Sequence, residues 1–323
     1  MKQSYLFLAT AGLFACGGDS GDDATSGEYK QLMREFVIGI STYSKAADAD
    51  FIVVPQNGIE LVSNDGDDPA TGSPGYLDAI DANGQEDLFY GYDNDDEATP
   101  ASTIDYLKPF LNLSKNNGNV ILVTDYCSGQ THMNDSYAKN KNAGFISFAA
   151  DHRELDNIPA IPSPVNSENN ATVASITQVK NFLYLINPES YASKTAFINA
   201  VTATNYDLLI MDLFFTDGNA FTAAEVTQLK SKANGGKRLI ICYMSIGEAE
   251  NYRYYWDPAW NSSKPLWMAA VNPDWPGNYK VRYWDPAWQA IIYGNDNSYV
   301  KKILDAGFDG VYLDIIDAFE YFE

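Results

Sequence analysis

Near its end the chain reads GFDGVYLDIIDAFEYF (residues 307–322), an apolar run that carries Asp314 and Asp317. Similar short runs rich in Val, Ile, Leu, Phe and Tyr recur upstream, separated by segments with helical spacing, which is typical of βα units. We interpret eight runs as strands, at residues 51–54, 87–91, 120–126, 145–150, 182–186, 208–214, 238–246 and 310–316. Eight parallel strands are the number that closes a (β/α)8 TIM barrel, which is the fold class we expect.

The order of the helices predicts that this barrel is circularly permuted. Helical patterns cover residues 28–47, 101–114, 189–202, 223–233 and 287–306. Because the chain ends seven residues after its last strand, that strand has no helix of its own and must use the first one. We therefore expect residues 310–316 to pair with residues 51–54, and the proline-containing segment 157–178 to join the original ends. The alternative fold is a doubly wound open sheet, but no GxGxxG or GxxxxGKS/T motif follows any strand.

Composition predicts one globular domain over residues 28–323. Hydrophobic residues make up 46% of the 323 residues, enough for one large core. The formal net charge is −22, from 21 Lys and Arg against 43 Asp and Glu. Since so acidic a surface repels phosphate backbones, we expect no nucleic-acid partner. We also expect a monomer, and a capping box of Thr222 and Glu225 at one helix start.

The first residues predict export. Residues 1–15 combine a charged tip, a short apolar run and small residues, as a signal peptide does. The stretch LFAC (13–16) is similar to a bacterial lipobox, in which cleavage leaves Cys16 as a lipidated N-terminus. A Gly/Ser/Asp-rich tether follows at residues 16–27. We therefore expect a bacterial lipoprotein of the outer membrane, facing the periplasm or the cell surface and held by its lipid alone.

The sequence offers few metal-binding motifs. Two cysteines besides Cys16 and two histidines lack CxxC or HExxH spacing, so we expect no cofactor and no zinc or other metal. The stretch DNDDE (93–97, Asp93 to Glu97) alternates oxygen ligands, which leaves a Ca²⁺ site open beside the alternative of a solvated loop. Hydrolytic chemistry would then rest on carboxylates.

Carboxylates recur where the predicted strands end. They are Glu60, Asp125, Asp212, Glu248, Asp314 and Asp317. The strand ends of a parallel barrel meet at one face, where active sites lie, and an acid in an apolar strand is costly unless it is paired or used. Any one of them can be structural, but six at one face favour a function. Two carboxylates that flank a glycosidic bond suffice to hydrolyse it, one as proton donor and the other as nucleophile or base.

The aromatic residues favour a carbohydrate ligand. All six tryptophans lie between residues 256 and 288, together with several tyrosines. Flat rings offer apolar faces to sugar C–H groups, and tyrosine hydroxyls add hydrogen bonds. The alternative is a long loop that folds around its own small aromatic core.

Three stretches resemble the first half of the endo-α-1,4-polygalactosaminidase family, glycoside hydrolase family 114. They are LIICYMSIGEAENYRYYW (239–256), WPGNYKVRYWDPAWQ (275–289) and GFDGVYLDIIDAFEYF (307–322). Three others resemble its second half, FIVVPQNGIELV (51–62), EDLFYGYDND (86–95) and GFISFAADHRELD (144–156). The halves are swapped, which agrees with the permutation inferred from the helices.

This resemblance implies roles for single residues. Asp314 matches the strand-end catalytic aspartate of the family, the expected nucleophile, and Glu60 matches its second catalytic carboxylate, the expected acid/base. Glu248 and Asp212 would support the substrate or tune the acid. The other residues that we expect at the substrate site are Asp125, Asp317, Asn57, Tyr90, Arg153, Tyr243, Trp256 and Trp284.

The leading hypothesis is therefore a lipid-anchored glycosidase that cuts a polysaccharide. The resemblance implies an α-linked, galactosamine-containing or related amino-sugar polymer, and a cationic polymer suits an acidic protein. One alternative is a non-catalytic glycan-binding lipoprotein on the same barrel. Another is a metal-dependent hydrolase that uses the aspartates.

Overall fold

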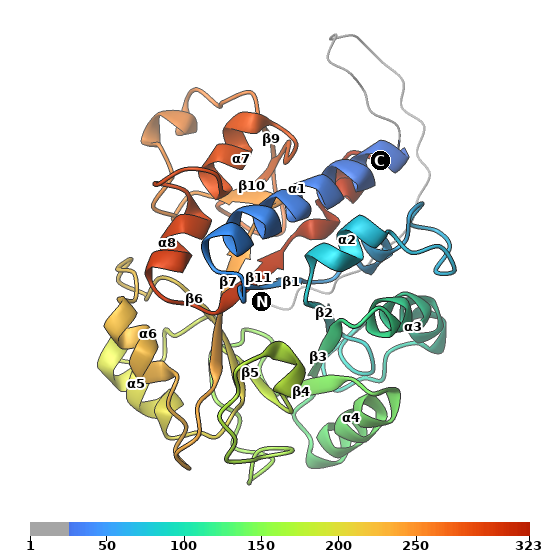
Figure 1. The fold of residues 1–323 in the computed structure, drawn as a ribbon, viewed down its shortest axis with the longest axis vertical. Coiled ribbons are helices and arrows are strands. Elements are labelled where there is room, and N and C mark those ends of the chain that lie inside the picture. The colour runs from blue at the N-terminus through green and yellow to red at the C-terminus, as the bar shows by residue number, and fades with distance from the viewer. Residues whose placement is uncertain (1–25) are drawn as a thin grey trace.

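The computed structural model describes residues 26–323, which form a mixed α/β fold with parallel strands in the middle and helices outside them (Figure 1). The predicted signal peptide, Cys16 and most of the tether lie outside the described residues. In the part of the chain that the structure describes, every helix is too short or too polar to span a bilayer.

Two parallel sheets contain the strands expected from the sequence. The larger has the order β1-β11-β7-β6-β5 and the smaller β2-β3-β4. The bounds are β1 Ile52–Pro55, β2 Ala82–Glu86, β3 Val120–Tyr126, β4 Ile146–Ala150, β5 Phe182–Tyr184, β6 Leu208–Asp212, β7 Leu239–Ser245 and β11 Gly310–Asp314. All of these except β2 lie within two residues of the predicted bounds.

The first and last strands lie side by side, which confirms the predicted pairing. β1 runs parallel to β11, with Ile52 opposite Gly310. The two sheets also meet, because Gln56, directly after β1, forms a parallel bridge with Gly84 of β2. At the other edges β4 contacts β5, with no ladder between them among residues 26–323. The carboxyl ends of β11, β1 and β2 are therefore neighbours.

The helices bring the two ends of the described chain together. In Figure 1, α1 lies beside the C-terminal segment, where the Tyr29 and Phe322 ring centroids are 5.6 Å apart and Lys30 Nζ is 3.5 Å from Glu323. The α-helices are α1 Ser26–Ala47, α2 Pro74–Ala79, α3 Ala101–Asn116, α4 Gln130–Ala143, α5 Lys194–Thr202, α6 Ala223–Leu229, α7 Pro286–Ile292 and α8 Tyr299–Asp305. The 3-10 helices are η1 Ile59–Val62, η2 Ile176–Gln178, η3 Pro258–Asn261 and η4 Ile316–Tyr321.

Several expected elements differ from the structure. The second strand is Ala82–Glu86 and not 87–91, because its polar side chains find partners; Asn83, for example, accepts from Ser114 of α3 at 2.5 Å. The predicted helix 287–306 is two helices, α7 and α8, since the chain turns at Gly294, whose φ is 97°. The helix predicted from residue 189 begins at Lys194, and the one predicted to 233 ends at Leu229. The capping box of Thr222 and Glu225 is confirmed.

A small antiparallel sheet follows β7. Its order is β8-β10-β9, with β8 Glu248–Glu250, β9 Met268–Val271 and β10 Asn278–Val281. Trp288 fixes this region to the parallel sheet by donating from Nε1 to the Ile246 carbonyl at 2.9 Å. The segment 157–178, which was expected to join the original ends, connects β4 to β5 and contains η2.

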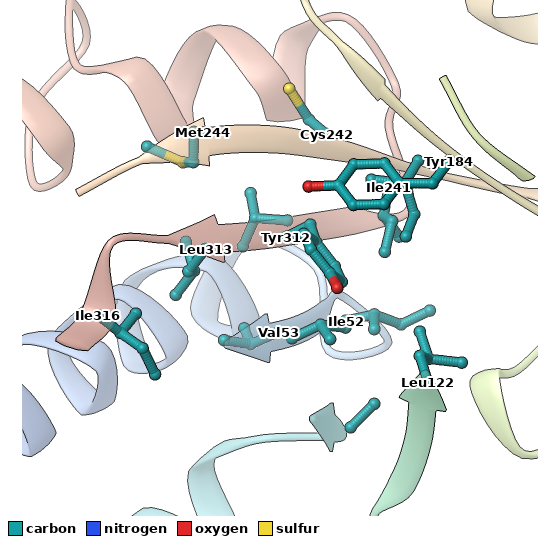
Figure 2. Packing of buried hydrophobic residues seen from close by; sticks show 14 of the residues in the cluster. Ile52, Val53, Leu122, Tyr184, Ile241, Cys242, Met244, Tyr312, Leu313 and Ile316 are labelled. Carbon is teal, nitrogen blue, oxygen red and sulfur yellow. The ribbon is translucent and has the colours of Figure 1, made fainter. Parts of the chain in front are cut away.

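Large aromatic side chains fill the space between the parallel strands. Tyr184 of β5 and Tyr312 of β11 are buried edge to face, with ring centroids 5.2 Å apart (Figure 2). Gly84 of β2 makes room for the Tyr312 side chain, because a Cβ at residue 84 would overlap the Tyr312 hydroxyl. The approach of β2 to β11 therefore requires glycine at this position.

We expect Gly84→Ala to lower the free energy of unfolding by about 1–3 kcal/mol, since the added methyl group overpacks the interior. Denaturant unfolding measures this change. Gly75→Ala is the matched control, because a Cβ at Gly75 in α2 meets nothing within 4 Å, and a helical alanine should be neutral or stabilising. Equal stability of the two variants would contradict the packing argument.

Candidate active site

Asp314 is the last residue of β11 and stands at the carboxyl end of the larger sheet. Its Oδ2 accepts a hydrogen bond from the Tyr243 hydroxyl of β7 at 2.5 Å. Burial, and next the negative charge of Glu86, raise the pKa of Asp314 to about 7, and Glu250 acts in the same direction. A carboxyl group with a pKa near neutrality can take either protonation state, which acid–base and nucleophilic chemistry use.

Glu86, at the end of β2, is a second carboxylate of this centre, although it is not among the site residues predicted from the sequence. Its side chain accepts hydrogen bonds from Gln56 Nε2, from the Tyr126 hydroxyl and, at 3.1 Å, from Asn57 Nδ2. The Asn57 side chain in turn accepts from the Glu86 backbone N–H at 3.0 Å. Since three donors converge on Glu86, its carboxylate is held in one orientation.

Shared partners connect Asp314 with Glu86. Gln56 lies between them at the end of β1, donates to Glu86 and accepts from the Tyr184 hydroxyl at 2.8 Å. The Tyr184 ring centroid lies 6.5 Å from that of Tyr243, the hydrogen-bond donor to Asp314. The two acids thus stand on the two strands that flank β1, joined by polar and aromatic side chains.

The backbone directly after these three strands is strained. Asn57, Asp87 and Ile315 have φ values of 58°, 57° and 58°, in the left-handed region. A non-glycine residue there costs on the order of 1–3 kcal/mol, and a β-branched residue such as Ile315 is an outlier. Such strain gathers at sites where side chains must be aimed.

Arg153, from the loop after β4, braces the end of β2. Its guanidinium lies 3.0 Å from Asp87 and 2.7 Å from Asp95, donates to the Gly91 carbonyl at 2.7 Å and covers the Tyr126 ring at 3.9 Å. Burial raises the pKa of Asp87 to about 7 against the opposing charge of Arg153. These contacts show that Arg153 organises the loop after β2, and its binding of substrate stays a prediction.

Glu60, the acid/base expected from the resemblance, lies on η1 beyond the end of β1. Its Oε1 accepts from the Tyr106 hydroxyl of α3 at 2.9 Å. Burial and then neighbouring carboxylates raise the pKa of Asp317 and of Glu320 in η4, and Glu60 is among the carboxylates that act on both. Glu60 and Asp317 therefore belong to an acidic group that adjoins Asp314, whose charge also raises the pKa of Asp317. The carboxylates with the largest effects on the pKa of Asp314 itself are Glu86 and Glu250.

Asp212 and Glu248 have protein partners. Asp212, at the end of β6, pairs with Arg253 at 2.6 Å, and Arg253 also pairs with Glu250 of β8 at 2.5 Å. Glu248 is fully buried and accepts from three donors, Asn272 at 2.8 Å, Asn278 at 3.0 Å and Tyr321 at 3.1 Å. Glu248 therefore fixes the small sheet to η4, and its contact with a substrate stays a prediction.

Four other expected substrate residues make structural contacts. Asp125 is fully buried and accepts from four groups, the backbone N–H groups of Phe89 and Tyr90 and the side chains of Ser136 and Asn140. The Tyr90 hydroxyl donates to Asp135 at 2.8 Å. Trp256 packs on Trp260 and Tyr279, and Trp284 packs on Tyr29 and Phe322. The contacts of Trp256 lie within its own segment, as the alternative of a local aromatic core predicts, whereas Trp284 packs on α1 and the C-terminal end.

Within residues 26–323, no group of three or more His, Cys, Asp or Glu side chains is arranged to hold a metal ion. In the stretch 93–97, Asp95 pairs with Arg153, and Asp96 accepts from the Ser128 backbone N–H at 2.7 Å. These two carboxylates join loops of the protein to one another.

A parallel α/β frame with carboxylates at adjacent strand ends is an arrangement that glycoside hydrolases use. Residues 166–323 match the family model of the glycoside-hydrolase family GH114, which supports the assignment of the chain to that family. The matched residues include Asp314 but neither Glu60 nor Glu86, which lie in the part before residue 166.

Three proteins named as uncharacterized are similar to the chain. One from Methanocaldococcus jannaschii is 37% identical over 180 residues, which is 55% of this chain and 49% of that protein. One from Deinococcus radiodurans is 44% identical over 123 residues, 38% of this chain and 37% of that protein. One from Thermotoga maritima is 34% identical over 121 residues, 38% and 36% of the two chains. The chain thus spans about half the length, or less, of the curated relatives that it matches.

The raised pKa of Asp314 predicts a stability cost at high pH. The folded protein keeps the Asp314 proton to about pH 7, whereas the unfolded chain releases it near the ordinary aspartate pKa of 3.8, so stability falls as pH rises between these values. Asp314→Asn should therefore raise the melting temperature at pH 8, on the order of 2–4 °C for each kcal/mol relieved, and change it little at pH 4.

Asp96→Asn is the control of opposite sign for this thermal unfolding experiment. Burial acts to raise the pKa of Asp96, but hydrogen bonds from Ser128 outweigh burial and lower this pKa to about 2. The Asp96 carboxylate thus stabilises the fold above pH 4, and Asp96→Asn should lower the melting temperature at pH 8. A lower melting temperature for Asp314→Asn at pH 8 would contradict the assigned electrostatics.

Proposed function

We propose that this chain is a glycosidase that works with two carboxyl groups, Asp314 and Glu86, on a circularly permuted (β/α)8 barrel. The observation that carries the proposal is the mutual position of the two acids, each at the end of a strand beside β1, with the charge of Glu86 acting on Asp314. The barrel is supported by the β1–β11 pairing, the bridge between Gln56 and Gly84, and the contact of β4 with β5.

In this proposal Asp314 is the nucleophile and Glu86 the acid/base. Because the two acids interact, they share one proton near neutral pH. In the reactive form this proton is on Glu86, which gives it to the glycosidic oxygen while the Asp314 carboxylate attacks the anomeric carbon. Glu86 then takes a proton from the water that displaces the sugar from Asp314. Tyr243 orients Asp314, and Gln56, Asn57 and Tyr126 orient Glu86.

Glu60 is the alternative acid/base. It is supported by the family resemblance of QNGIE, residues 56–60, whereas Glu86 is supported by its hydrogen bonds and by its effect on the Asp314 pKa. We favour Glu86, because a proton donor and a nucleophile act on the two sides of a single bond and must lie close together.

We propose a polysaccharide as the substrate, α-linked and rich in galactosamine or a related amino sugar. The resemblance suggests this class, and a net charge of −22 would attract a partly deacetylated, cationic polymer. A glycan-binding lipoprotein without turnover is the alternative, which the activity measurement below distinguishes from a glycosidase.

The test compares Asp314→Asn, Glu86→Gln and Glu60→Gln on de-N-acetylated α-1,4-linked galactosamine polymer, with release of reducing ends as the readout. We expect the first two variants to lose about 10²–10⁴-fold in kcat/KM, the range of a lost acid–base or nucleophilic group. Glu60→Gln should stay within about tenfold of wild type, because it removes only a neighbouring charge.

Two outcomes would overturn parts of this proposal. A large loss in Glu60→Gln together with a small one in Glu86→Gln would assign the acid/base to Glu60. Binding of the polymer without any release of reducing ends, for the wild type across a broad polysaccharide panel, would favour the non-catalytic lipoprotein.

We also propose that Cys16 is lipidated and that the protein is held in the outer membrane of a bacterium. The support is the lipobox-like stretch LFAC at residues 13–16. Expression in a Gram-negative host with radiolabelled palmitate should label the wild type and not Cys16→Ser, which should leave the membrane fraction. Equal labelling of both proteins would rule out Cys16 as the lipidated residue.

A further inference from the structure

Arg253 is a buried cation between two buried carboxylates. Its side chain is 6% exposed, with Nη1 2.6 Å from Asp212 Oδ2 and Nε 2.5 Å from Glu250 Oε2. The Tyr252 hydroxyl also donates to Glu250, and the Tyr252 ring centroid lies 5.2 Å from the guanidinium carbon of Arg253. Glu250 therefore has both carboxylate oxygens engaged and a fixed orientation.

The location of this ion-paired group is informative. Asp212 ends β6, the strand that pairs with β7. Glu250 ends β8, in the segment that follows β7, and the last residues of β7 pair with the end of β11, where Asp314 stands. Arg253 thus ties the small antiparallel sheet to the strand ends at the proposed active site.

Glu250 is one of the negative charges that Asp314 meets. It acts on Asp314 and also on Tyr243, the hydrogen-bond donor to Asp314. The titratable groups that face Asp314 are Glu86 of β2, Tyr184 of β5, Tyr243 of β7, Glu250 of β8, Tyr312 of β11, and Asp317 and Tyr321 of η4. A cation that neutralises one acid of this set changes the charge balance at Asp314.

We propose that Arg253 is a positioning residue for the Asp314 centre, which holds Glu250 against the end of β6 and offsets its negative charge. This inference rests on the proposed role of Asp314. Without the guanidinium, Glu250 loses its counter-ion, so that the ionised form of Asp314 becomes less favourable and Asp314 titrates at higher pH. Removing the Glu250 charge has the opposite effect.

The experiment follows the Asp314 carboxyl carbon by NMR in full-length protein labelled with ¹³Cγ-aspartate, with Asp314→Asn to assign the signal. We expect the titration midpoint to rise by about 1 pH unit in Arg253→Gln and to fall by a similar amount in Glu250→Gln. The double variant should titrate close to wild type. Because the titration needs no substrate, it tests the role of Arg253 even if no glycosidase activity is found.

Lys232→Gln is the matched control, because Lys232 is also a buried cation and pairs with Asp207 at 2.9 Å, with both side chains fully buried. Asp207 directly precedes β6, at the opposite end of the strand from Asp212. The control should lose stability and leave the Asp314 midpoint unchanged. An unchanged midpoint in folded Arg253→Gln, or an equal shift in Lys232→Gln, would overturn the proposal. If Arg253→Gln does not fold, an unchanged or higher midpoint in Glu250→Gln would overturn it.

Discussion

The parallel pairing of β1 with β11 is the constraint on which the rest of the structure depends. It joins strands that lie more than two hundred and fifty residues apart in the sequence, with Ile52 opposite Gly310. Gln56 then continues from β1 to a bridge with Gly84. Asp314 and Glu86 stand on different sheets, and this pairing together with the bridge brings their strand ends to the two sides of β1, where the charge of Glu86 acts on Asp314.

The strand ends hold more negative charge than a buried region tolerates without compensation. Two arginines supply the compensating positive charge. Arg153 pairs with Asp87 and Asp95 next to Glu86, and Arg253 pairs with Asp212 and Glu250 near Asp314. Tyr126, whose ring the Arg153 guanidinium covers, donates to Glu86, and Tyr243 donates to Asp314. The arginines thus pair with the surrounding carboxylates, whereas Glu86 and Asp314 accept hydrogen bonds from neutral tyrosine hydroxyls.

Apolar strands and amphipathic helices could be predicted from the sequence, whereas features that depend on tertiary partners could not. The run 120–126 became β3 unchanged, because its side chains are buried whatever lies beside them. The strand ANGQE, residues 82–86, has no apolar pattern, since its stability comes from hydrogen bonds to α3 and from the space that Gly84 leaves. For the same reason the apolar pattern predicts this strand at residues 87–91, five residues late, and does not include Glu86. The polar helix α4 escaped prediction because its buried face includes Ser136 and Asn140, which bind Asp125.

The side-chain period of two along a strand explains why the two acids face each other once the strands are correctly placed. In β11, Tyr312 points into the interior, so Asp314, two residues later, lies on the same face. In β2, Gly84 receives the Tyr312 hydroxyl, so Glu86 is on the inner face as well, while Asn83 turns outward to Ser114. The contact of Tyr312 with Gly84 therefore places Asp314 and Glu86, each two residues further along its strand, on the inner face of the sheets. A slip of one residue in either strand would turn its acid toward the helices, and the interior would lose one of its two carboxylates.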